Sequence, residues 1–218
     1  MGGALGADAV GCGFIGEGGG MREGVLRLHV SRGSGRRGYA PSEGGGVRWL
    51  VTASDLPGRR ARVAERLGLS TWVVPSGDRW SHCKSASRIL QVMGAMDARR
   101  LGVDEVLMVN ERGEVVEGSG SNFFWVEGGV VCTPALACGA LAGVTRGIVM
   151  DLARELGMGV WERVLTLGEL VRVEQAFLTS SLRELSRVKE LEGRRLRVGA
   201  EFRALERAYR RRVVAECG

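Results

Sequence analysis

The chain has 218 residues, of which 44% are hydrophobic, so it can bury a core in one large domain or two small ones. It contains no run of eighteen apolar residues, which excludes a membrane-spanning helix on length. Its five cysteines are odd in number and lack a C-x-x-C pair, which favours free thiols in a reducing compartment over a metal site or a disulfide framework. The glycine-rich start has no basic stretch before an apolar core, so the sequence predicts a cytoplasmic protein.

The net charge of +6 and the pI near 9.5 would permit binding to nucleic acid, and the arginines of residues 207–212 form the best local patch for it. Apolar residues recur through this segment at helical spacing: Phe202, Leu205, Tyr209 and Val213. The spacing favours a packed terminal helix whose polar face carries the arginines. We therefore expect no specific nucleic-acid partner, and the charge suits the attraction of a small anionic substrate.

A first strand and a glycine-rich loop follow the start of the chain. Residues 1–24 lack periodicity and are predicted to be disordered. The alternation from Val25 to Val30 predicts a strand, which leads into the loop S-R-G-S-G-R-R-G-Y-A-P over residues 31–41. The glycines of this loop let the backbone approach an anion, and the guanidinium groups of Arg32 and Arg37 can hold carboxylates. A surface loop with incidental arginines fits the pattern equally well.

The next elements alternate between strands and helices. We predict a strand over Val47–Ala53, a short helix within residues 57–68, and a strand over Ser70–Val74. A longer helix is expected from about Ser87 to Leu101, ended by Gly102. Because strands and helices alternate along the whole chain without a regular βαβ rhythm, the sequence predicts a mixed α/β or α+β fold.

Lysine is rare in this chain, since only Lys84 and Lys189 are found among its 31 basic residues. A lysine can lose its proton and form a Schiff base with an aldehyde cofactor, whereas an arginine cannot. Lys84 lies in the turn before the predicted helix, where it can project into a cleft that desolvates the amine and lowers its pKa. Lys189 lies in a run of charged residues, which predicts a solvated surface position. Lys84 is therefore the candidate catalytic residue.

A hairpin around Asn110–Gly113 is predicted to end at Glu117. The small residues G-S-G-S-N after Glu117 leave room for a flat ligand against the backbone, and the strand Asn122–Val126 follows them. One interpretation of Glu117 is an exposed carboxylate at the end of a strand, which is the usual position of a glutamate. The other is an anion that keeps the nitrogen of a pyridine ring protonated and the ring electron-withdrawing.

Two later segments are candidate anion sites. Small residues lead to Thr145, which we predict to be the N-cap of a helix that ends at Gly157. Free N–H groups at the start of that helix could hold a phosphate, although a capping threonine with no ligand has the same pattern. The strand Glu174–Leu178 leads into Thr179–Ser181, whose hydroxyls could donate to phosphate or carboxylate oxygens or only cap a loop.

Four motifs in this order resemble those of one family. H-C-K-S-A-S-R resembles the segment with the Schiff-base lysine, E-G-S-G-S-N-F-F resembles E-G-x-x-x-N-[IVL]-F, G-V-T-R resembles the phosphate-binding loop, and T-S-S-L-R-E-L resembles the loop near the phosphate and the substrate carboxylate. Over about residues 25–214 the chain resembles the fold type IV enzymes that depend on pyridoxal 5′-phosphate, the class IV aminotransferase family. The cofactor-binding residues that the resemblance implies are Lys84, Glu117, Asn122, Val144, Thr145, Ser180 and Ser181.

Within this family, the loop over residues 31–41 looks most like the S-R-G-S-G-G-R-G-Y of 4-amino-4-deoxychorismate lyases. The resemblance implies that the substrate amine displaces Lys84, which then takes the proton from the carbon that bears the nitrogen. Pyruvate leaves as the ring becomes aromatic, and 4-aminobenzoate for folate synthesis remains. The substrate-binding residues implied in this way are Arg32, Arg37, Tyr39, Ser181 and Leu182.

The chain departs from the family pattern at its start, where relatives have a small domain with a G-D-x-x-F-E-T-like strand and an H-x-x-R-L helix. We expect a glycine-rich segment over residues 1–24, a remnant of the small domain over 25–80, and the large cofactor-binding domain over 81–218. Relatives also often have asparagine where Ser87 stands. The resemblance implies a homodimer. An aminotransferase for branched-chain or D-amino acids, acting through Lys84, and an inactive fragment or anion-binding protein are the alternatives.

Overall fold

The computed structural model describes residues 24–35, 37–40, 46–58 and 64–217. The chain divides into two units, Met1–Gly58 and Arg59–Gly218. The boundary expected between residues 80 and 81 falls within the second unit. The expected disorder over residues 1–24 lies, except for Gly24, outside the described residues.

The first unit is a β-hairpin of β1 (Gly24–Ser31) and β2 (Arg48–Asp55), which confirms the two strands predicted there. Both strands have large apolar side chains that are exposed: Leu26, Leu28, Val30, Trp49, Leu50 and Val51. The loop between the strands turns at Gly33 and Gly38, both of which have positive φ. A hydrogen bond of 2.8 Å from the Arg48 guanidinium to the Ser34 hydroxyl joins the loop to β2.

One of the two sheets of the second unit is a five-stranded mixed sheet, against which α2 (Ile89–Leu101) packs. As predicted, the helix ends at Gly102, whose φ of 67° few other residues adopt. The strands are, in order across the sheet, β12 (Arg194–Arg195), β11 (Glu190–Leu191), β3 (Arg66–Val74), β4 (Glu105–Asn110) and β5 (Val115–Gly118).

The prediction of a short helix within residues 57–68 is wrong at its C-terminal end, because β3 already begins at Arg66. Residues 59–63 of that prediction lie outside the described part of the chain. Leu67 is 1% exposed, and β3 pairs in parallel with β4 and β11. The local helical pattern is thus overridden by pairing and burial that involve residues far away in the sequence.

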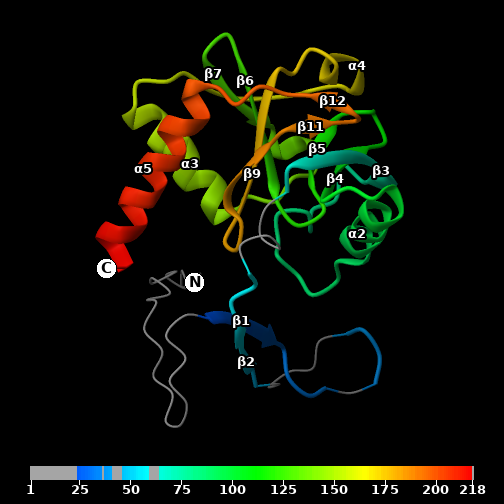
Figure 1. Ribbon diagram of the computed structural model, residues 1–218. Helices are drawn as coiled ribbons and strands as arrows, with labels where there is room; N and C mark the ends of the chain where they lie inside the picture. Colours follow the sequence, from blue (N-terminus) through cyan, green and yellow to red (C-terminus); the bar gives the residue numbers. More distant parts are fainter. Residues whose placement is uncertain (1–23, 36, 41–45, 59–63, 218) are drawn as a thin grey trace. The chain divides into compact units, whose positions relative to one another are not determined.

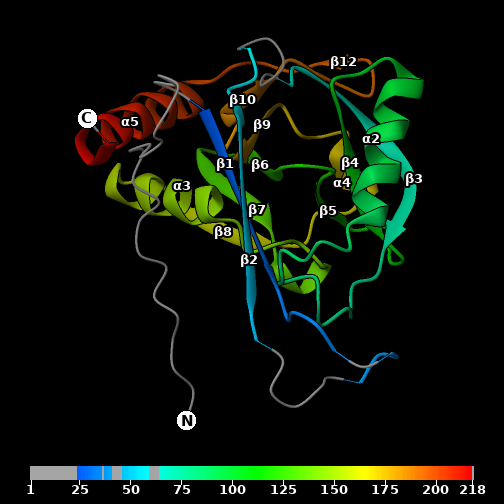
Figure 2. The ribbon, with the colours of Figure 1, turned by 90° about the horizontal axis from the view of Figure 1, so that it is seen from below.

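A second five-stranded sheet carries α3 (Val144–Glu155) and α5 (Ala200–Cys217) on its outer face. Its strands are, in order across the sheet, β10 (Glu184–Val188), β9 (Gln175–Ser180), β6 (Asn122–Glu127), β7 (Val130–Pro134) and β8 (Val160–Arg163). Two short elements connect these strands, namely the 3₁₀ turn η1 (Leu136–Cys138) and α4 (Leu167–Leu170). Figures 1 and 2 show α2 on one side of the second unit and α3 with α5 on the other.

The main core lies between the two sheets, where Leu67 and Leu107 of the first sheet pack in one cluster with Phe123, Trp125 and Leu178 of the second. These side chains are almost fully buried. Burial of about 25 cal/mol for each Å² of apolar surface makes such a cluster the main stabilising contribution to the fold. The packed sheets give a rigid frame on which the loops at the strand ends can be placed.

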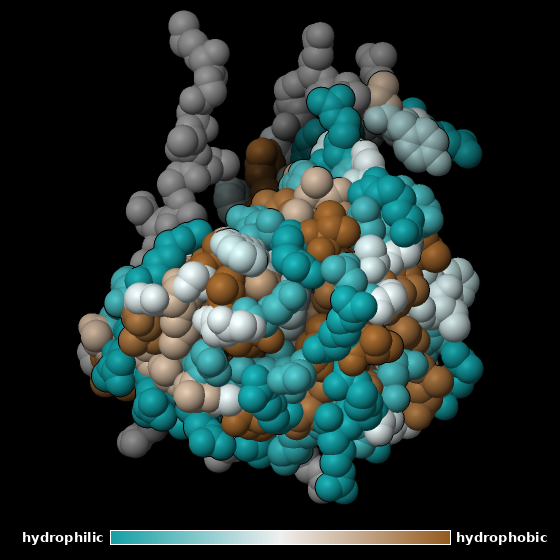
Figure 3. All heavy atoms as spheres, turned by 90° about the horizontal axis from the view of Figure 1, so that it is seen from above, coloured by the Kyte–Doolittle hydropathy of each residue, from teal (hydrophilic) through white to brown (hydrophobic). Residues whose placement is uncertain are grey.

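The terminal helix α5 confirms the interpretation of its arginines as a polar face. Phe202, Leu205 and Tyr209 are buried against the second sheet and α3. On the outer side, Arg210 pairs with a glutamate one turn earlier and Arg212 pairs with a glutamate of α3. Figure 3 shows a face on which hydrophobic side chains are interspersed among hydrophilic ones, as is usual for a protein surface in water. Among the helices of the described residues, none is long and apolar enough to cross a membrane.

Candidate active site

A cavity of about 360 Å³ opens in the second unit, where the ends of β5 and β9 meet the starts of β6 and α3. Its volume falls in the range of small-ligand pockets, which is about 300–1,000 Å³. The cavity is lined by all seven residues that the sequence resemblance assigned to the cofactor: Lys84, Glu117, Asn122, Val144, Thr145, Ser180 and Ser181. Residues from four motifs that are far apart in the sequence therefore face one space.

Glu117 is buried at the inner wall of this cavity, with 7% of its surface exposed. Burial raises the pKa of Glu117 to about 7. A hydrogen bond from the Leu141 N–H and the nearby charges of Arg88 and Lys84 act in the other direction and lower the pKa, but their effect is smaller than that of burial. The exposed strand-end alternative is therefore wrong. A buried carboxyl poised near neutrality can pair with the protonated nitrogen of a ligand ring.

Asn122 and the segment before α3 hold Glu117 in place. Nδ2 of Asn122 donates to Oε2 of Glu117 at 3.1 Å and to the Leu141 carbonyl at 2.8 Å, while the Leu141 N–H donates to the same Glu117 oxygen at 3.0 Å. Gly143 lies against Asn122, because a Cβ built on Gly143 would collide with Oδ1 of Asn122. These contacts fix the start of α3 to the carboxylate of the cavity wall.

Thr145 is not the N-cap of α3, which corrects the sequence prediction. The N-cap is Gly143, and Thr145 is the second residue of the helix, 5% exposed. A larger residue is excluded at the N-cap by the contact with Asn122. Since no side chain of the described residues caps this helix, the N–H groups of its first turn and the positive end of its dipole remain available to an anion.

Another part of the cavity wall is formed by the end of β9. The Thr179 side chain is fully buried, and its hydroxyl has no hydrogen-bond partner among the described residues; the same holds for the hydroxyl of Ser121. Both residues line the cavity, so they are unused polar groups that a bound ligand could satisfy. Ser180 and Ser181 also face this space, whereas Leu182 is 40% exposed and is not among the described residues that line it.

Lys84 lies on the segment between β3 and α2, four residues before Arg88, the N-cap of α2. The Arg88 guanidinium donates to the Cys83 carbonyl at 3.1 Å and so holds the backbone next to Lys84. Lys84 lines the cavity but is exposed, so its position differs from the desolvated cleft expected from the sequence. Lys189 is a surface residue as predicted, paired with Glu65 at 2.8 Å.

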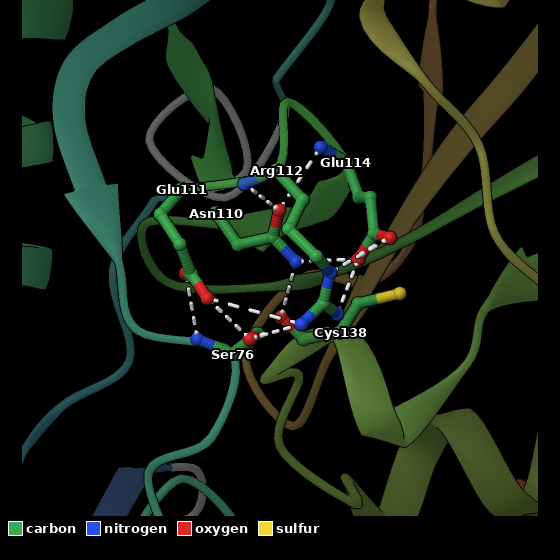
Figure 4. Close-up of polar contacts among 6 residues, drawn as sticks. All are labelled: Ser76, Asn110, Glu111, Arg112, Glu114 and Cys138. Atoms are coloured by element: carbon green, nitrogen blue, oxygen red, sulfur yellow. Dashed lines mark hydrogen bonds and ion pairs between the residues drawn. The ribbon is translucent and has the colours of Figure 1, made fainter.

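The β4–β5 hairpin supports both irregular segments that reach the cavity (Figure 4). On one side, Ser76 donates its N–H to Oε2 of Glu111 at 2.9 Å, and its hydroxyl accepts a hydrogen bond from Arg112. On the other side, Nδ2 of Asn110 donates to the Cys138 carbonyl at 3.1 Å. Ser76 begins the segment that leads to Lys84, and Cys138 ends the 3₁₀ turn that leads to Leu141.

Arg112 is central to this network, because it also binds both carboxylate oxygens of Glu114, at 3.0 and 2.6 Å. We expect Arg112→Ala to lower the melting temperature by a few degrees, since it removes hydrogen bonds to Glu114 and Ser76 together. Differential scanning calorimetry would measure the change. Arg154→Ala is the matched control, because Arg154 makes one exposed ion pair with Asp151 on α3. Equal melting temperatures for the two variants would show that the network adds nothing beyond a surface ion pair.

Several cavity residues escaped the sequence reasoning. Arg88 was not predicted as a site residue, although its position at the start of α2, next to the cavity, could have suggested a role. The Thr179 hydroxyl was predicted as a candidate donor, but only the structure shows that it is buried and has no hydrogen-bond partner among the described residues. Leu141 acts through its backbone, for which a side chain gives no signal. Arg32, Arg37 and Tyr39 belong to the first unit, where they are exposed, and their role in substrate binding remains a prediction.

Comparisons with known proteins identify the family of the chain. A family model described as amino-transferase class IV matches residues 13–191. The D-alanine aminotransferase of Bacillus licheniformis is 29% identical over 181 residues, which are 82% of this chain and 62% of that protein. The solved branched-chain aminotransferase of Thermoproteus uzoniensis, with norvaline, matches with a TM-score of 0.82 at 30% identity, covering 90% of this chain and 67% of its own. The 4-amino-4-deoxychorismate lyase of Pseudomonas aeruginosa matches with a TM-score of 0.81 at 28% identity, covering 87% and 72%.

The chain belongs to the class IV aminotransferase family, and its fold is that of the fold type IV enzymes, as the sequence predicted. It spans about three-fifths of the length of the curated relatives that it matches, 61% and 62% in two of them. The cofactor of the family is pyridoxal 5′-phosphate, and another branched-chain aminotransferase with a similar structure has been solved with pyridoxamine 5′-phosphate.

The residues of the cavity fit this cofactor. Its aldehyde needs a lysine, its ring nitrogen needs a carboxylate, and its phosphate needs N–H and hydroxyl donors. The cavity offers Lys84, the buried Glu117 and the uncapped start of α3. The unused hydroxyls of Ser121 and Thr179 add polar groups that no described residue satisfies.

Proposed function

We propose that this chain is a pyridoxal 5′-phosphate enzyme that breaks a bond at a carbon bearing an amino group. The observation that carries the proposal is the convergence of Lys84, Glu117 and the start of α3 on one cavity of about 360 Å³. Lys84 is the catalytic residue, and it reaches the cavity from the segment before α2. The nearby charges of Arg88 and Lys84, which act to lower the pKa of Glu117, also favour an anionic ligand.

When bound, the cofactor supplies an electron-withdrawing ring that accepts the electron pair left at a carbon that has lost its proton. Nζ of Lys84 takes that proton, because an amine next to the reacting carbon can act as the base. The Glu117 carboxylate keeps the ring nitrogen protonated, and Asn122 orients Glu117 through its hydrogen bond of 3.1 Å. The chain would thus supply one base, Lys84, and one anion, Glu117, to the reacting system.

The phosphate group is held at the start of α3 in this proposal. The N–H groups of Val144 and Thr145 lie in the first turn of the helix, where they have no intrahelical acceptor. Ser180 and Ser181 supply hydroxyl donors from the end of β9 and the turn after it. Because the Ser180 oxygen already accepts the Arg183 N–H at 3.1 Å, its own hydrogen is free to donate.

We further propose that the reaction is the conversion of 4-amino-4-deoxychorismate to 4-aminobenzoate and pyruvate. The proposal is supported by the resemblance of residues 31–41 to the loop of the corresponding lyases and by the structural likeness to one of them. The substrate loses a proton from the carbon bearing nitrogen, and the carbon–oxygen bond to the enolpyruvyl group breaks as the ring becomes aromatic, so no co-substrate is needed. Arg32, Arg37, Tyr39 and Ser181 would bind this small dianion in a cytoplasmic homodimer, whereas Leu182, which is not among the described residues that line the cavity, is left out of the proposal.

An aminotransferase of the same family is the second candidate, favoured by the likeness to the branched-chain and D-alanine aminotransferases. It would use the same Lys84 and Glu117, but it would pass the amino group to an oxo acid. The catalytically inactive fragment or anion-binding protein is the third candidate. A chain that takes up cofactor but catalyses neither reaction would support it.

Two assays on the purified protein with added pyridoxal 5′-phosphate separate these candidates. We expect 4-amino-4-deoxychorismate to give 4-aminobenzoate, followed by its fluorescence, together with an equal amount of pyruvate. Formation of glutamate from 2-oxoglutarate with a branched-chain or D-amino acid, in the absence of lyase product, would instead establish the aminotransferase. Lys84→Ala is the control that should remove either activity.

A further inference from the structure

Glu105 is a buried carboxylate close to the cavity that neither the motifs nor the proposed chemistry uses. It is the first residue of β4 and is 3% exposed. One carboxylate oxygen, Oε1, accepts the Ser119 N–H at 3.1 Å and the hydroxyl of the same serine. The other oxygen, Oε2, accepts a hydrogen bond from Nη2 of Arg183 at 3.2 Å.

Of these two partners, Ser119 lines the cavity, whereas Arg183 is linked to the cavity residue Ser180. Ser119 lies in the loop Gly118–Ser121, which continues from β5 of the first sheet. Arg183 lies in the turn between β9 and β10 of the second sheet, and its N–H donates to the hydroxyl oxygen of Ser180. The carboxylate of Glu105 therefore joins the loops of both sheets at the point where the sheets border the cavity.

The contact of the Glu105 carboxylate with Ser119 and Arg183 is strong, because it is a buried contact of a charged group. A buried carboxylate is tolerated only when charged or N–H donors satisfy its oxygens, and here both oxygens are engaged. Gly118 allows the tight fold of this loop, since a Cβ built on it would meet the Ser121 hydroxyl oxygen at 2.5 Å, and Gly120 lies beside the Glu105 carboxylate. Glu105 is thus placed to fix the backbone of one loop and the turn of the other at the same time.

We infer that Glu105 is a positioning residue for the cofactor site, an inference that rests on the proposed function. Its carboxylate holds Gly118–Ser121 and Ser180–Arg183 in the spacing that the ligand needs, so that Ser121 and Ser180 face the ligand together. Glu105 does not line the cavity among the described residues, and it acts through Ser119 and Arg183.

The test is Glu105→Gln, which keeps the shape of the side chain but removes its charge. The matched control is Asp97→Asn, because Asp97 is also buried, 6% exposed, and accepts hydrogen bonds from Ser70 and Thr71, away from the cavity. In cofactor-free protein, hydrogen exchange should become about tenfold faster in both loops of Glu105→Gln and stay unchanged there in Asp97→Asn. Tenfold is the change expected when one hydrogen bond to a charged group is lost.

A titration with pyridoxal 5′-phosphate gives the second measurement. The Kd should rise at least about tenfold in Glu105→Gln and stay at the wild-type value in Asp97→Asn. If Glu105→Gln does not fold, Arg183→Gln tests the same link and should loosen both loops. The inference would be overturned if hydrogen exchange in the loops stayed unchanged or if only one loop responded. It would also be overturned if Glu105→Gln had the same Kd as Asp97→Asn. A wild type that binds no cofactor would refute the proposed function instead, while hydrogen exchange would still decide whether Glu105 joins the loops.

Discussion

Replacing Lys84 with arginine is expected to abolish turnover, although the substitution keeps the positive charge of the side chain. A guanidinium stays protonated at all accessible pH values, so it can neither bond to an aldehyde carbon nor take a proton from the substrate. Loss of the acid–base step alone costs about 10²- to 10⁴-fold in rate. The initial rate of product formation, with cofactor in excess, measures the effect.

The chain offers its own control for this change, because Lys189 is the other lysine in the sequence. Lys189 lies on the surface and pairs with Glu65 at 2.8 Å, a contact that arginine can also make. Lys189→Arg should therefore retain the wild-type rate. If Lys84→Arg kept more than a tenth of the wild-type rate, Lys84 would not be the base, and the proposed chemistry would have to use another residue.

Substituting Glu117 with glutamine is expected to change how the stability of the cofactor-free protein depends on pH. Burial raises the pKa of Glu117 to about 7, whereas its ordinary value in an unfolded chain is 4.5. The folded protein therefore holds this proton more tightly than the unfolded chain does. Consequently, wild type loses stability as the pH rises from about 4.5 through 7, and the gap between the two pKa values corresponds to about 3 kcal/mol.

Glutamine carries no such proton, so the stability of Glu117→Gln lacks this pH dependence. The difference in the free energy of unfolding, variant minus wild type, should therefore increase by up to about 3 kcal/mol between pH 4.5 and pH 8. Urea unfolding at a series of pH values measures this difference. Glu114→Gln is a control of opposite sign, because the Arg112 guanidinium holds the pKa of Glu114 at about 2. Glu114 contributes stability above its ordinary pKa that is lost as the pH falls toward 2. A Glu117→Gln difference that is constant across the pH range would contradict the burial of an ionisable carboxyl at this wall.

The cavity could be anticipated from the sequence where a residue type is itself the signal. Lys84 stands out because this chain uses arginine for all but two of its basic residues, and Glu117 with Asn122 stands in a motif of small residues at the end of a strand. The α/β fold and most strands followed from apolar alternation and from turn residues such as Gly102 and Gly113, which both have positive φ. In these cases a local property of the chain is enough.

The sequence was a poor guide wherever the position or role of a residue depends on contacts with residues outside its own local pattern. Thr145 has the residue type of an N-cap, but the contact between Gly143 and Asn122 moves the start of α3. The start of β3 at Arg66 depends on strands paired beside it, not on its own helical pattern. Glu105 could not be assigned a role, because its partner Arg183 is 78 residues away in the sequence.

The central claim is that pyridoxal 5′-phosphate binds covalently to Lys84 in this cavity, and peptide mapping after borohydride reduction tests it most directly. The purified protein is incubated with the cofactor, reduced, digested and analysed by mass spectrometry, beside Lys84→Ala treated in the same way. We predict one phosphopyridoxyl group per chain of wild type, located on the peptide that contains Lys84, and no such group in the variant. Modification of Lys189 in place of Lys84, or equal labelling of wild type and Lys84→Ala, would contradict the claim.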